Sequence, residues 1–420
     1  MLKMKKRSVY VLVAFLLVIG SASSVFGQTA FGKIWAWGSN EMEKCIVPTP
    51  NSGFIAISTA THHNLGLRFD GTITAWGWND WGQCNVPASD VPFIAISAGW
   101  GHSLGLKADG KVVAWGNNWY GQCNVPTSEL PFIAISAGTY HSLGLKSDGS
   151  VVAWGLNSEG QCNPPADNSG FFAIDAGGYH NLGLKSDGTV VAWGRNVEGQ
   201  CNVPTPNSDF IAVSAGAYHS LGLKSDGTVV AWSYDPDGRS TVPTPNSDFM
   251  AIAAGWYHSV GIKSDGTVVA WGRDDVGQLD VPAPRPGFFA VAAGCGHTIV
   301  LEGVTFEGFF NPVDNDSVNY VHAGQTIPVI WKITDLDGLP ISDPESFVGI
   351  KSSIVNCESF TDLSAILADE PAAGSSGLHY RGEGLWQYNW KTSEAYAGQC
   401  RTLKLTLYDG SEHTASFSFK

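Results

Sequence analysis

Tryptophan and histidine each recur every 39 residues, and this period constrains the fold more than any other feature of the sequence. The repeating tryptophans are Trp37, Trp76, Trp115, Trp154, Trp193, Trp232 and Trp271. The repeating histidines are His63, His102, His141, His180, His219, His258 and His297. A strict period of this length indicates one structural unit copied along the chain, because each copy buries its apolar surface against its neighbours. We therefore expect seven copies of one unit.

Within one unit, short apolar runs alternate with turn residues. Residues 132–155 read Phe-Ile-Ala-Ile-Ser-Ala-Gly, Thr-Tyr, His-Ser-Leu-Gly-Leu-Lys, Ser-Asp-Gly and Ser-Val-Val-Ala-Trp-Gly. Runs rich in Val, Ile and Phe that are separated by Asp-Gly are typical of β-hairpins. The runs are apolar on successive residues, which predicts strands covered on both faces. At 39 residues, the unit has about the minimum length of a four-stranded propeller blade.

The order of the strands predicts a closed ring rather than an open solenoid. Trp37 precedes every repeating histidine, and His297 has no tryptophan strand after it. If residues 297–301 pair with residues 33–37, these two incomplete units form one blade. Closure removes the exposed strand edges that an open array must cap. The predicted fold is all-β: a seven-bladed propeller closed by its N- and C-terminal strands, followed by a C-terminal antiparallel β-sandwich.

The first 27 residues are interpreted as a secretory signal peptide, with a basic start, an apolar stretch from Val9 to Ile19, and small residues before a cut after Gly27. The apolar stretch is too short to span about 30 Å of hydrocarbon, and no later segment is longer, so we expect no membrane span. Export predicts a secreted protein in the extracellular space or the periplasm.

The composition excludes nucleic acid as an expected partner. The formal charge is −14, and removing the signal peptide, with four basic and no acidic residues, changes it to −18. A protein this acidic repels phosphate backbones.

The cysteines fall into two groups. Five of the eight occupy one repeat position, and equivalent positions of neighbouring blades are too far apart for a disulfide, so we interpret these five as small buried hydrophobic residues. They are Cys45, Cys84, Cys123, Cys162 and Cys201. Cys357 and Cys400 lie outside the repeats and form the predicted disulfide in an exported protein.

The repeat pattern Ala-Gly-x-x-His-Ser-Leu-Gly-Leu-Lys-x-Asp-Gly-x-Val-x-Ala-Trp-Gly-x-Asn-x-x-Gly-Gln resembles the regulator of chromosome condensation family over residues 31–303. The resemblance implies a seven-bladed propeller. Within that family, the short repeat, the signal peptide and the Trp-Gly-x-Asn-x-x-Gly-Gln-x-x-Val-Pro segment look most like the secreted propeller-type β-lactamase inhibitory proteins. The chain departs from the pattern late in the ring, at Trp232-Ser-Tyr-Asp235 and at Leu279-Asp280.

A second domain follows the repeats. Alternating segments such as residues 403–408 and 414–419 predict antiparallel hairpins of a β-sandwich. Residues 308–315, 327–332 and 398–401 resemble the small PxKF-type module at the C-termini of secreted prokaryotic proteins, although Ile330 stands where that family has lysine. The predicted organisation is a signal peptide at 1–27, a propeller at 28–303 and a sandwich module at 304–420.

Two loops of each unit are expected on one face of the ring, here called the top face: the Ala-Gly-x-x-His loop and the Trp-Gly-x-Asn loop. The opposite Ser-Asp-Gly turns are alike, whereas the top loops vary and are rich in Tyr and Trp, which often dominate binding energy at interfaces. Each aromatic residue has the alternative role of packing against the next blade. The predicted partner-binding residues are Trp78, Trp81, Trp100, Trp119, Tyr120, Tyr140, Tyr179, Tyr218, Tyr234, Trp256 and Tyr257.

The repeated histidines are better explained as hydrogen-bonded framework residues than as metal ligands or catalytic groups, because convergence on one ion would need a narrow axial cluster. The sequence contains no activated-nucleophile, phosphate-binding or zinc-protease motif. We predict no enzyme activity, no catalytic residue, no metal site and no cofactor.

These features predict a monomeric, secreted scaffold that binds an extracellular or periplasmic protein through its top face. The resemblance implies that this partner is an enzyme that the scaffold inhibits. Two alternatives remain open. The aromatic rings could stack on glycans in carbohydrate or cell-surface adhesion, or a hydrolase or lyase site could lie in the central channel, as in some other propellers.

Overall fold

The computed structural model describes residues 32–282, 287–314, 317–335, 340, 347–357, 368–369, 378–407 and 412–420. The predicted signal peptide lies outside these residues. The described chain separates into two compact units. The first contains Ile34–Pro48 and Ala56–Leu301, and the second contains Glu302–Lys420 together with residues 32–33 and Thr49–Ile55. Among the described residues, no helix has the length and apolar character needed to cross a membrane.

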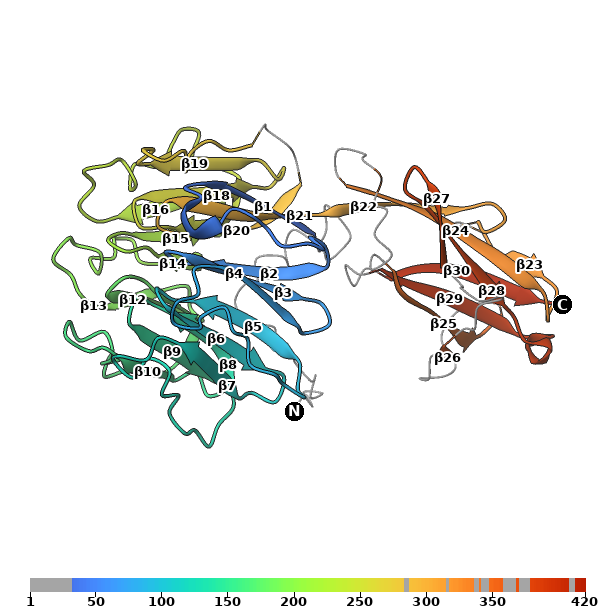
Figure 1. Cartoon of the computed structure of the whole chain (residues 1–420), viewed down its shortest axis with the longest axis horizontal. Helices are drawn as coiled ribbons and strands as arrows, with labels where there is room; N and C mark the ends of the chain where they lie inside the picture. Colours follow the sequence, from blue (N-terminus) through green and yellow to red (C-terminus); the bar gives the residue numbers. More distant parts are fainter. Residues whose placement is uncertain are drawn as a thin grey trace, which may run out of the picture. The chain divides into compact units, whose positions relative to one another are not determined.

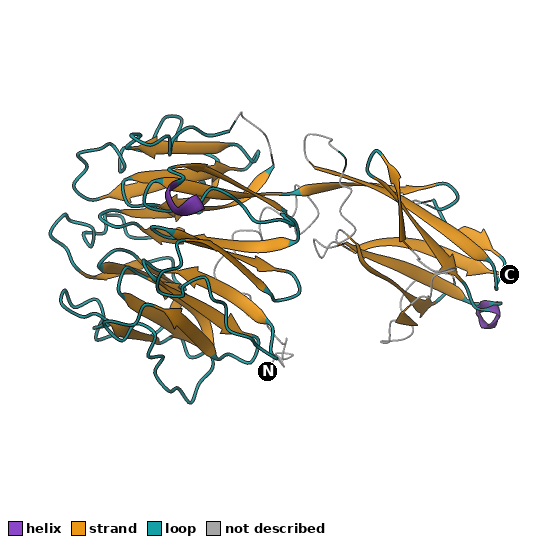
Figure 2. Cartoon of the chain, in the orientation of Figure 1, coloured by secondary structure: helices purple, strands orange, loops and turns teal. Residues whose placement is uncertain are grey.

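Seven three-stranded sheets form a propeller, and each has an inner, a middle and an outer strand. Figure 2 shows these strands in orange and the loops that join them in teal. The inner strands of blades 1 to 7 are β2 (Phe54–Thr59), β5 (Phe93–Ala98), β8 (Phe132–Ala137), β11 (Phe171–Ala176), β14 (Phe210–Ala215), β17 (Phe249–Ala254) and β20 (Phe288–Ala293). The middle strands are β3 (His63–Arg68), β6 (His102–Lys107), β9 (His141–Lys146), β12 (His180–Lys185), β15 (Ser220–Lys224), β18 (His258–Lys263) and β21 (His297–Glu302). The outer strands are β4 (Ile73–Gly77), β7 (Val112–Gly116), β10 (Val151–Gly155), β13 (Val190–Gly194), β16 (Val229–Trp232), β19 (Val268–Gly272) and β1 (Lys33–Gly38).

The ring closes as predicted. Blade 7 has the strand order β1-β21-β20, so the first strand of the chain completes a sheet with the last strands of the repeat region. Figure 1 shows blue β1 beside orange β20 and β21. The structure thereby confirms the predicted all-β fold and the closure of the propeller by strands from both ends of the repeat array.

The Asp-Gly turns form the hairpins for a local reason. In blade 3, the Asp148 carboxylate accepts a hydrogen bond from the backbone N–H of Ser150 at 3.0 Å, and Gly149 has φ +79°. Only glycine adopts this left-handed conformation without a steric penalty, so the turn sequence fixes where β9 ends and β10 begins. The two strands then pair in register, with Trp154 opposite Ser142.

Each blade has three strands among the described residues, not the four that usually form a propeller blade. After the outer strand of blade 3, residues 156–163 form a loop stabilised by its own side chains, which extends from the end of β10. The unit is therefore short because a hydrogen-bonded loop, rather than a fourth strand, follows the outer strand.

Adjacent blades share a continuous apolar core. Leu104 and Leu106 of β6 are fully buried and pack with Phe132, Ile135 and Trp154 of the next blade. Burial of such side chains contributes about 25 cal/mol per Å² of apolar surface, so the middle strands, covered by blades on both sides, stabilise the ring most. This packing explains why those strands are apolar on successive residues.

A ring of seven hydrogen bonds between side chains links every blade to the next. His102 Nε2 lies 2.9 Å from Ser142 Oγ, and His141 Nε2 lies 2.7 Å from Asn181 Oδ1. The ring closes where His297 Nε2 lies 2.8 Å from Asn64 Oδ1. The other four pairs are His63–Ser103, His180–Ser220, His219–Ser259 and His258–Thr298. Each repeating histidine is thus a framework residue that binds the following blade.

The ring sets the tautomer of the histidines. Ser142 Oγ donates to the backbone carbonyl of Gln122 at 2.9 Å, so its oxygen accepts the hydrogen bond from His102 Nε2–H. The Nδ1 atoms of all seven rings are buried and have no hydrogen-bond partner. A charged imidazolium would place an unpaired N–H there, which is unfavourable. Burial lowers the pKa of His102 to about 3 and that of His141 to about 4.

The motif Ala-Gly-x-x-His follows from close packing around this ring. In blade 3, a Cβ atom on Gly138 would collide with the His141 imidazole and with the carbonyl of Gly177 in the next blade. Only glycine leaves room for both groups.

The second unit has two sheets. One has the order β22 (Val304–Phe310), β24 (Thr326–Asp335), β28 (Leu385–Lys391) and β27 (Leu378–Gly382). The other has the order β23 (Asn319–Val321), β30 (Glu412–Phe419), β29 (Cys400–Leu407), β25 (Phe347–Val355) and β26 (Ala368–Asp369). The β23–β30 pair is parallel, whereas the other described pairs are antiparallel. Trp331, Trp390 and Phe417 form the centre of the core between the sheets. Two short 3-10 helices, η1 (Glu41–Glu43) and η3 (Glu394–Tyr396), complete the described elements.

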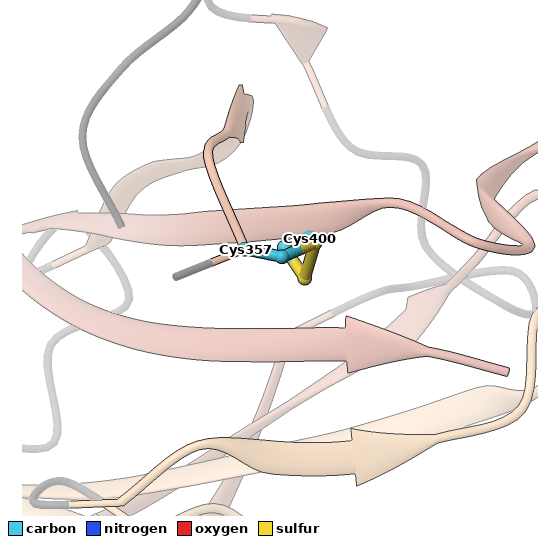
Figure 3. The surroundings of a disulfide bond; sticks show 2 residues. All are labelled: Cys357 and Cys400. Carbon is cyan, nitrogen blue, oxygen red and sulfur yellow. A yellow bond between two sulfur atoms is a disulfide. The ribbon is translucent and has the colours of Figure 1, made fainter. Parts of the chain in front are cut away.

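The predicted disulfide is present. Cys357 and Cys400 are joined, with their Cα atoms 5.1 Å apart (Figure 3). Cys400 is the first residue of β29, so the bond holds the end of β25 and the following residues to the five-stranded sheet. The structure confirms this pair.

The neutral histidine ring predicts a steep loss of stability in mild acid. Between about pH 4 and 6.5 the unfolded chain binds a proton at each histidine while the folded ring stays neutral, so unfolding takes up protons and stability falls as the pH falls. Asp175 has the opposite effect: burial raises its pKa in the folded protein to about 6, so over this pH range the folded state binds one proton that the unfolded chain does not. Unfolding therefore takes up as many as about six protons, net, and the unfolding free energy should fall by as much as about 8 kcal/mol per pH unit.

Guanidinium denaturation of the propeller at several pH values, followed by tryptophan fluorescence, measures this slope. His141→Gln should reduce the slope by about one proton, since it removes one titrating group from the ring. His379→Gln is the control, because that side chain is exposed and lies outside the propeller. An unfolding free energy that stays constant from about pH 7.5 to 5.5 would contradict the neutral ring.

Candidate functional site

The top face is built on a loop frame that is the same in most blades. In blade 3, Asn157 Oδ1 accepts from the Cys162 N–H at 2.9 Å, and Asn157 Nδ2 donates to Asn163 Oδ1 at 2.9 Å. Gln161 Oε1 accepts from the Glu159 N–H at 2.8 Å. The Asn-x-x-Gly-Gln-Cys-Asn residues thus hold the backbone, while the intervening positions are free to vary. The loop presents different side chains on a constant frame.

The frame is fastened to the following blade by the repeating tryptophan. Gln122 is buried, and its carbonyl oxygen accepts from Trp154 Nε1 at 2.8 Å and from Ser142 Oγ at 2.9 Å. The same carbonyl position receives a tryptophan Nε1–H in every blade. Tryptophan supplies both a large apolar ring and this donor, which explains its strict period.

The repeat cysteines differ from the sequence-based expectation. All five are free, as expected, but they are partly exposed rather than fully buried. Each thiol lies against the carbonyl two residues after the repeat tryptophan; Cys162 Sγ, for example, lies 3.1 Å from Leu156 O. Burial raises the pKa of Cys84, Cys123, Cys162 and Cys201 to about 11. They are uncharged supports of the loop frame, because a thiol satisfies a carbonyl that a purely apolar side chain would not.

Most of the predicted partner-binding aromatics form one connected cluster over blades 1 to 4. Trp81 is at its centre, with ring centroids 4.1 Å from Trp78, 4.7 Å from Trp100 and 5.2 Å from Trp119. Tyr140 extends the cluster, 5.1 Å from Trp100. Tyr120 and Tyr179 follow, with centroids 5.1 and 6.3 Å from that of Tyr140. Side chains from both kinds of top loop therefore meet on one face.

A second, smaller group lies on blades 5 and 6. Tyr218 stacks on Tyr257 at 5.9 Å, and Trp256 lies 6.2 Å from Tyr257. Tyr234 is 68% exposed, and its backbone N–H donates to the carbonyl of Glu198. The predicted residues also differ in exposure: Trp119 is 67% exposed, whereas Trp81 and Trp100 are half-buried.

Charged pairs lie on the same side of the ring as the second group. Arg195 and Glu198 are bonded at 2.6 Å, and the arginine holds the pKa of Glu198 at about 2. Arg273 pairs with Asp275, and its guanidinium lies 5.2 Å from the centroid of the Tyr257 ring. The top face thus has an aromatic half over the first blades and a mixed aromatic and charged half over blades 4 to 6.

Sequence reasoning missed several residues of this face. His62 packs edge-on against Trp78 at 5.3 Å, and Arg239 lies over the rings of Tyr218 and Tyr257. Arg239 and Lys44 occupy the position of the repeat glutamine and are buried. Comparison of the copies at this one position would have revealed both, because a charged residue at a buried repeat position departs from the pattern.

The altered loop after Trp232 has a distinct backbone. Ser233 stands where the other repeats have glycine, and it has φ 153°, a conformation that side chains rarely adopt. Its strand β16 ends one residue earlier than the other outer strands. Asp235 fills part of the Asn role, since its carboxylate accepts from Thr241 Oγ1 at 2.8 Å. The substitution therefore reshapes the loop that exposes Tyr234.

A narrow channel opens within the ring. Its top part is a cavity of about 70 Å³ lined by Trp100, Trp256 and the Ala-Gly residues of the inner strands. A larger cavity of about 210 Å³ continues between the inner strands and includes Asp175. Within the described residues, no group of three or more His, Cys, Asp or Glu side chains is placed to hold a metal ion.

The geometry and the repeat define a seven-bladed β-propeller whose blades are copies of one unit. The model of the regulator of chromosome condensation (RCC1) repeat matches residues 93–122, 132–161, 173–200, 210–239 and 251–278. These five segments, in blades 2 to 6, match the RCC1 repeat. In sequence, the chain matches no protein of curated function.

Solved structures share this fold at low sequence identity. Prp20p from Saccharomyces cerevisiae, whose binding to Gsp1p and histones was studied, is 18% identical with a TM-score of 0.57, covering 66% of this chain and 93% of that one. Yeast RCC1 (Prp20) bound to Kap60 is 19% identical with a TM-score of 0.57, covering 71% and 95%. Human WBSCR16 is 17% identical with a TM-score of 0.53, covering 65% and 99%.

The structure predicts that two tryptophans of the aromatic cluster have different roles. The Trp81 ring lies directly on the backbone of Gly101 and contacts three other indoles, so Trp81→Ala should lower the unfolding free energy by about 2–4 kcal/mol. Trp119 is mostly exposed, and Trp119→Ala should change it by less than about 0.5 kcal/mol. Denaturant unfolding of both variants distinguishes them; equal destabilisation would show that the exposed ring is also a packing residue.

Proposed function

We propose that this protein is a secreted recognition scaffold, without catalytic activity of its own, that binds an extracellular or periplasmic protein through the top face of its propeller. The observation that carries the proposal is the top loop, whose backbone is held by hydrogen bonds within the loop itself. This constant frame supports a cluster of aromatic side chains that vary from blade to blade and contact one another. Large rings held by packing lose little conformational entropy on binding, so they suit interface anchors. The reported protein binding of Prp20p supports the use of this fold for protein recognition.

The distribution of charge supports a protein partner. One half of the face is aromatic, and the other carries the Arg195–Glu198 and Arg273–Asp275 pairs beside tyrosine rings. Aromatic side chains together with polar and charged groups are typical of specific protein interfaces. The repeating histidines do not suit catalysis, because each one is hydrogen-bonded to the next blade and burial keeps its imidazole neutral.

A finer form of the proposal is that the partner is a secreted or periplasmic enzyme and that binding inhibits it. The resemblance of the Trp-Gly-x-Asn-x-x-Gly-Gln segment to the propeller-type β-lactamase inhibitory proteins supports this form. It is tested by adding the protein to a panel of secreted β-lactamases and measuring hydrolysis rates. Undiminished hydrolysis throughout the panel would exclude β-lactamases as the target. It would not contradict the broader proposal that the top face binds a protein.

Removal of three top-face tryptophans should abolish partner binding while the fold remains. The Trp100→Ala, Trp119→Ala, Trp256→Ala variant loses anchors that each contribute about 2 kcal/mol or more at an interface, so affinity should fall by at least about 100-fold. The measurement is affinity capture from the extracellular fraction of the producing organism, followed by a direct binding titration with the captured protein.

The control is Phe69→Ala, Leu130→Ala, which removes two exposed apolar side chains outside the top loops. Capture should be unchanged in this control, and both variants should be folded by circular dichroism. Equal capture by the triple tryptophan variant would refute recognition through this face. Binding of the wild type to a glycan array without a protein partner would instead favour carbohydrate adhesion.

A further inference from the structure

A second belt of hydrogen bonds surrounds the central channel, and one of its members differs from the rest. The fifth residue of each inner strand is serine in blades 1, 2, 3 and 5, and its hydroxyl accepts from the backbone N–H of the next blade. These serines are Ser58, Ser97, Ser136 and Ser214. Blade 4 has Asp175 at this position, and its Oδ2 accepts from the Ala215 N–H at 2.8 Å.

Five blades have a hydrogen-bond acceptor at this position, and Asp175 is the one that carries a charge; blades 6 and 7 have Ala253 and Ala292 there. Serine hydroxyls make the same inter-blade bond at 2.9–3.0 Å in four blades. The second oxygen of Asp175 accepts from Ser136 Oγ at 2.9 Å. The carboxylate therefore performs the structural task of a serine and adds a negative charge, which needs a separate explanation.

Asp175 also borders a cavity. Asp175 lines the channel cavity of about 210 Å³ together with the belt hydroxyls and apolar side chains such as Ile174, Val213 and Met250. Among the residues that line the two channel cavities, Asp175 is the one ionisable side chain. Its environment contains neutral hydrogen-bond donors and no cationic group, and burial raises its pKa to about 6. A buried carboxylate without a counter-ion is favourable when a cation can join it.

The top cavity of the channel, which lies next to the larger one, favours a cation. The top cavity shares six lining alanines with the larger one, so the two cavities are adjacent along the channel. Its lining includes Trp100 and Trp256, whose indole faces attract cations at close range. The formal charge of −14 also favours cationic over anionic ligands.

We propose that the channel binds a primary alkylammonium group, with Asp175 as its counter-ion, the serine hydroxyls as hydrogen-bond acceptors and the apolar wall around the alkyl chain. A divalent metal ion fits less well, because it needs several oxygen ligands with more than one charge, and the channel supplies one carboxylate beside aliphatic walls. This site goes beyond the recognition role of the top face and does not depend on it.

Calorimetric titration of the purified protein with n-butylammonium chloride tests the site. At about pH 7.5 the wild type should bind, and Asp175→Ser should bind at least about tenfold more weakly, since the loss of one ion pair in a partly desolvated site has an effect of this order. Serine already occupies the equivalent position in four blades, so this variant keeps the belt. Asp175→Asn, which keeps the shape of the side chain, should behave the same way.

The controls separate charge from size. Glu129→Gln removes one negative charge from an exposed position and should bind like the wild type. Butan-1-ol has the same chain without the charge and should not bind. At about pH 6 a pKa of about 6 leaves half of Asp175 ionised, so wild-type affinity should fall about twofold in protein that circular dichroism shows to be folded. No other ionisable side chain lines the cavities, so this pH effect is assigned to Asp175.

Two sources could supply the ammonium group, and a second titration distinguishes them. Binding of both n-butylammonium and an acetylated Gly-Lys-Gly amide peptide assigns the site to a lysine side chain; binding of butylammonium alone assigns it to a free amine. Equal affinity of the wild type and Asp175→Ser for butylammonium, or no binding to the wild type, would overturn the site. The assay contains no protein partner, so this failure would not affect the proposed recognition function.

Discussion

The hydrogen bond from each repeating histidine to the next blade is the interaction on which the propeller depends. It places a polar group inside an apolar interface, and that group is satisfied only when the following blade supplies Ser, Asn or Thr at the correct position. The bond from His297 to Asn64 applies the same requirement to the two ends of the repeat array. Ring closure and blade register are therefore specified by one contact that is repeated seven times.

The same contact connects the frame to the top face. For six of the histidines, the hydroxyl or amide that accepts the hydrogen bond also donates to the carbonyl of the preceding loop. Ser142 donates in this way to Gln122 O, and Trp154 Nε1 donates to the same carbonyl. The loop that carries the variable side chains is thus attached to the most buried part of the ring. A face built in this way can change its side chains from blade to blade without a change in fold, which is the arrangement a recognition scaffold needs.

The sequence predicted the fold well because strict repetition amplifies weak local signals. The Asp-Gly turns, the apolar middle strands and the unmatched positions of Trp37 and His297 led to the closed ring that the structure confirms. The strand count per blade was not predictable, because a loop bonded by Asn157 and Gln161 is not visible as a pattern of apolar residues. The partial exposure of the cysteines had the same origin, since a thiol that binds a carbonyl looks like a hydrophobic residue in sequence.

The sequence predicted which aromatic residues belong to the candidate site, but it did not predict which of them contact one another. Repetition located the top loops and their aromatic residues, but it could not show that Trp81 contacts three other indoles or that Arg239 lies over two tyrosine rings. Those contacts depend on how neighbouring blades meet in three dimensions. Asp175 was overlooked because the turn and strand signals around it are ordinary; it is distinguished only by its charge at a position where the other blades have serine or alanine.

The most direct test of the account is the protonation state of the seven ring histidines. Long-range nitrogen–proton NMR spectra of protein labelled with ¹⁵N-histidine report the tautomer and charge of each imidazole. The account predicts seven neutral rings protonated at Nε2, unchanged down to about pH 5.5 while the protein remains folded. Rings that become charged at the pKa of a free histidine, about 6.5, in the folded protein would contradict it, because the frame would then tolerate the buried charges it is built to exclude.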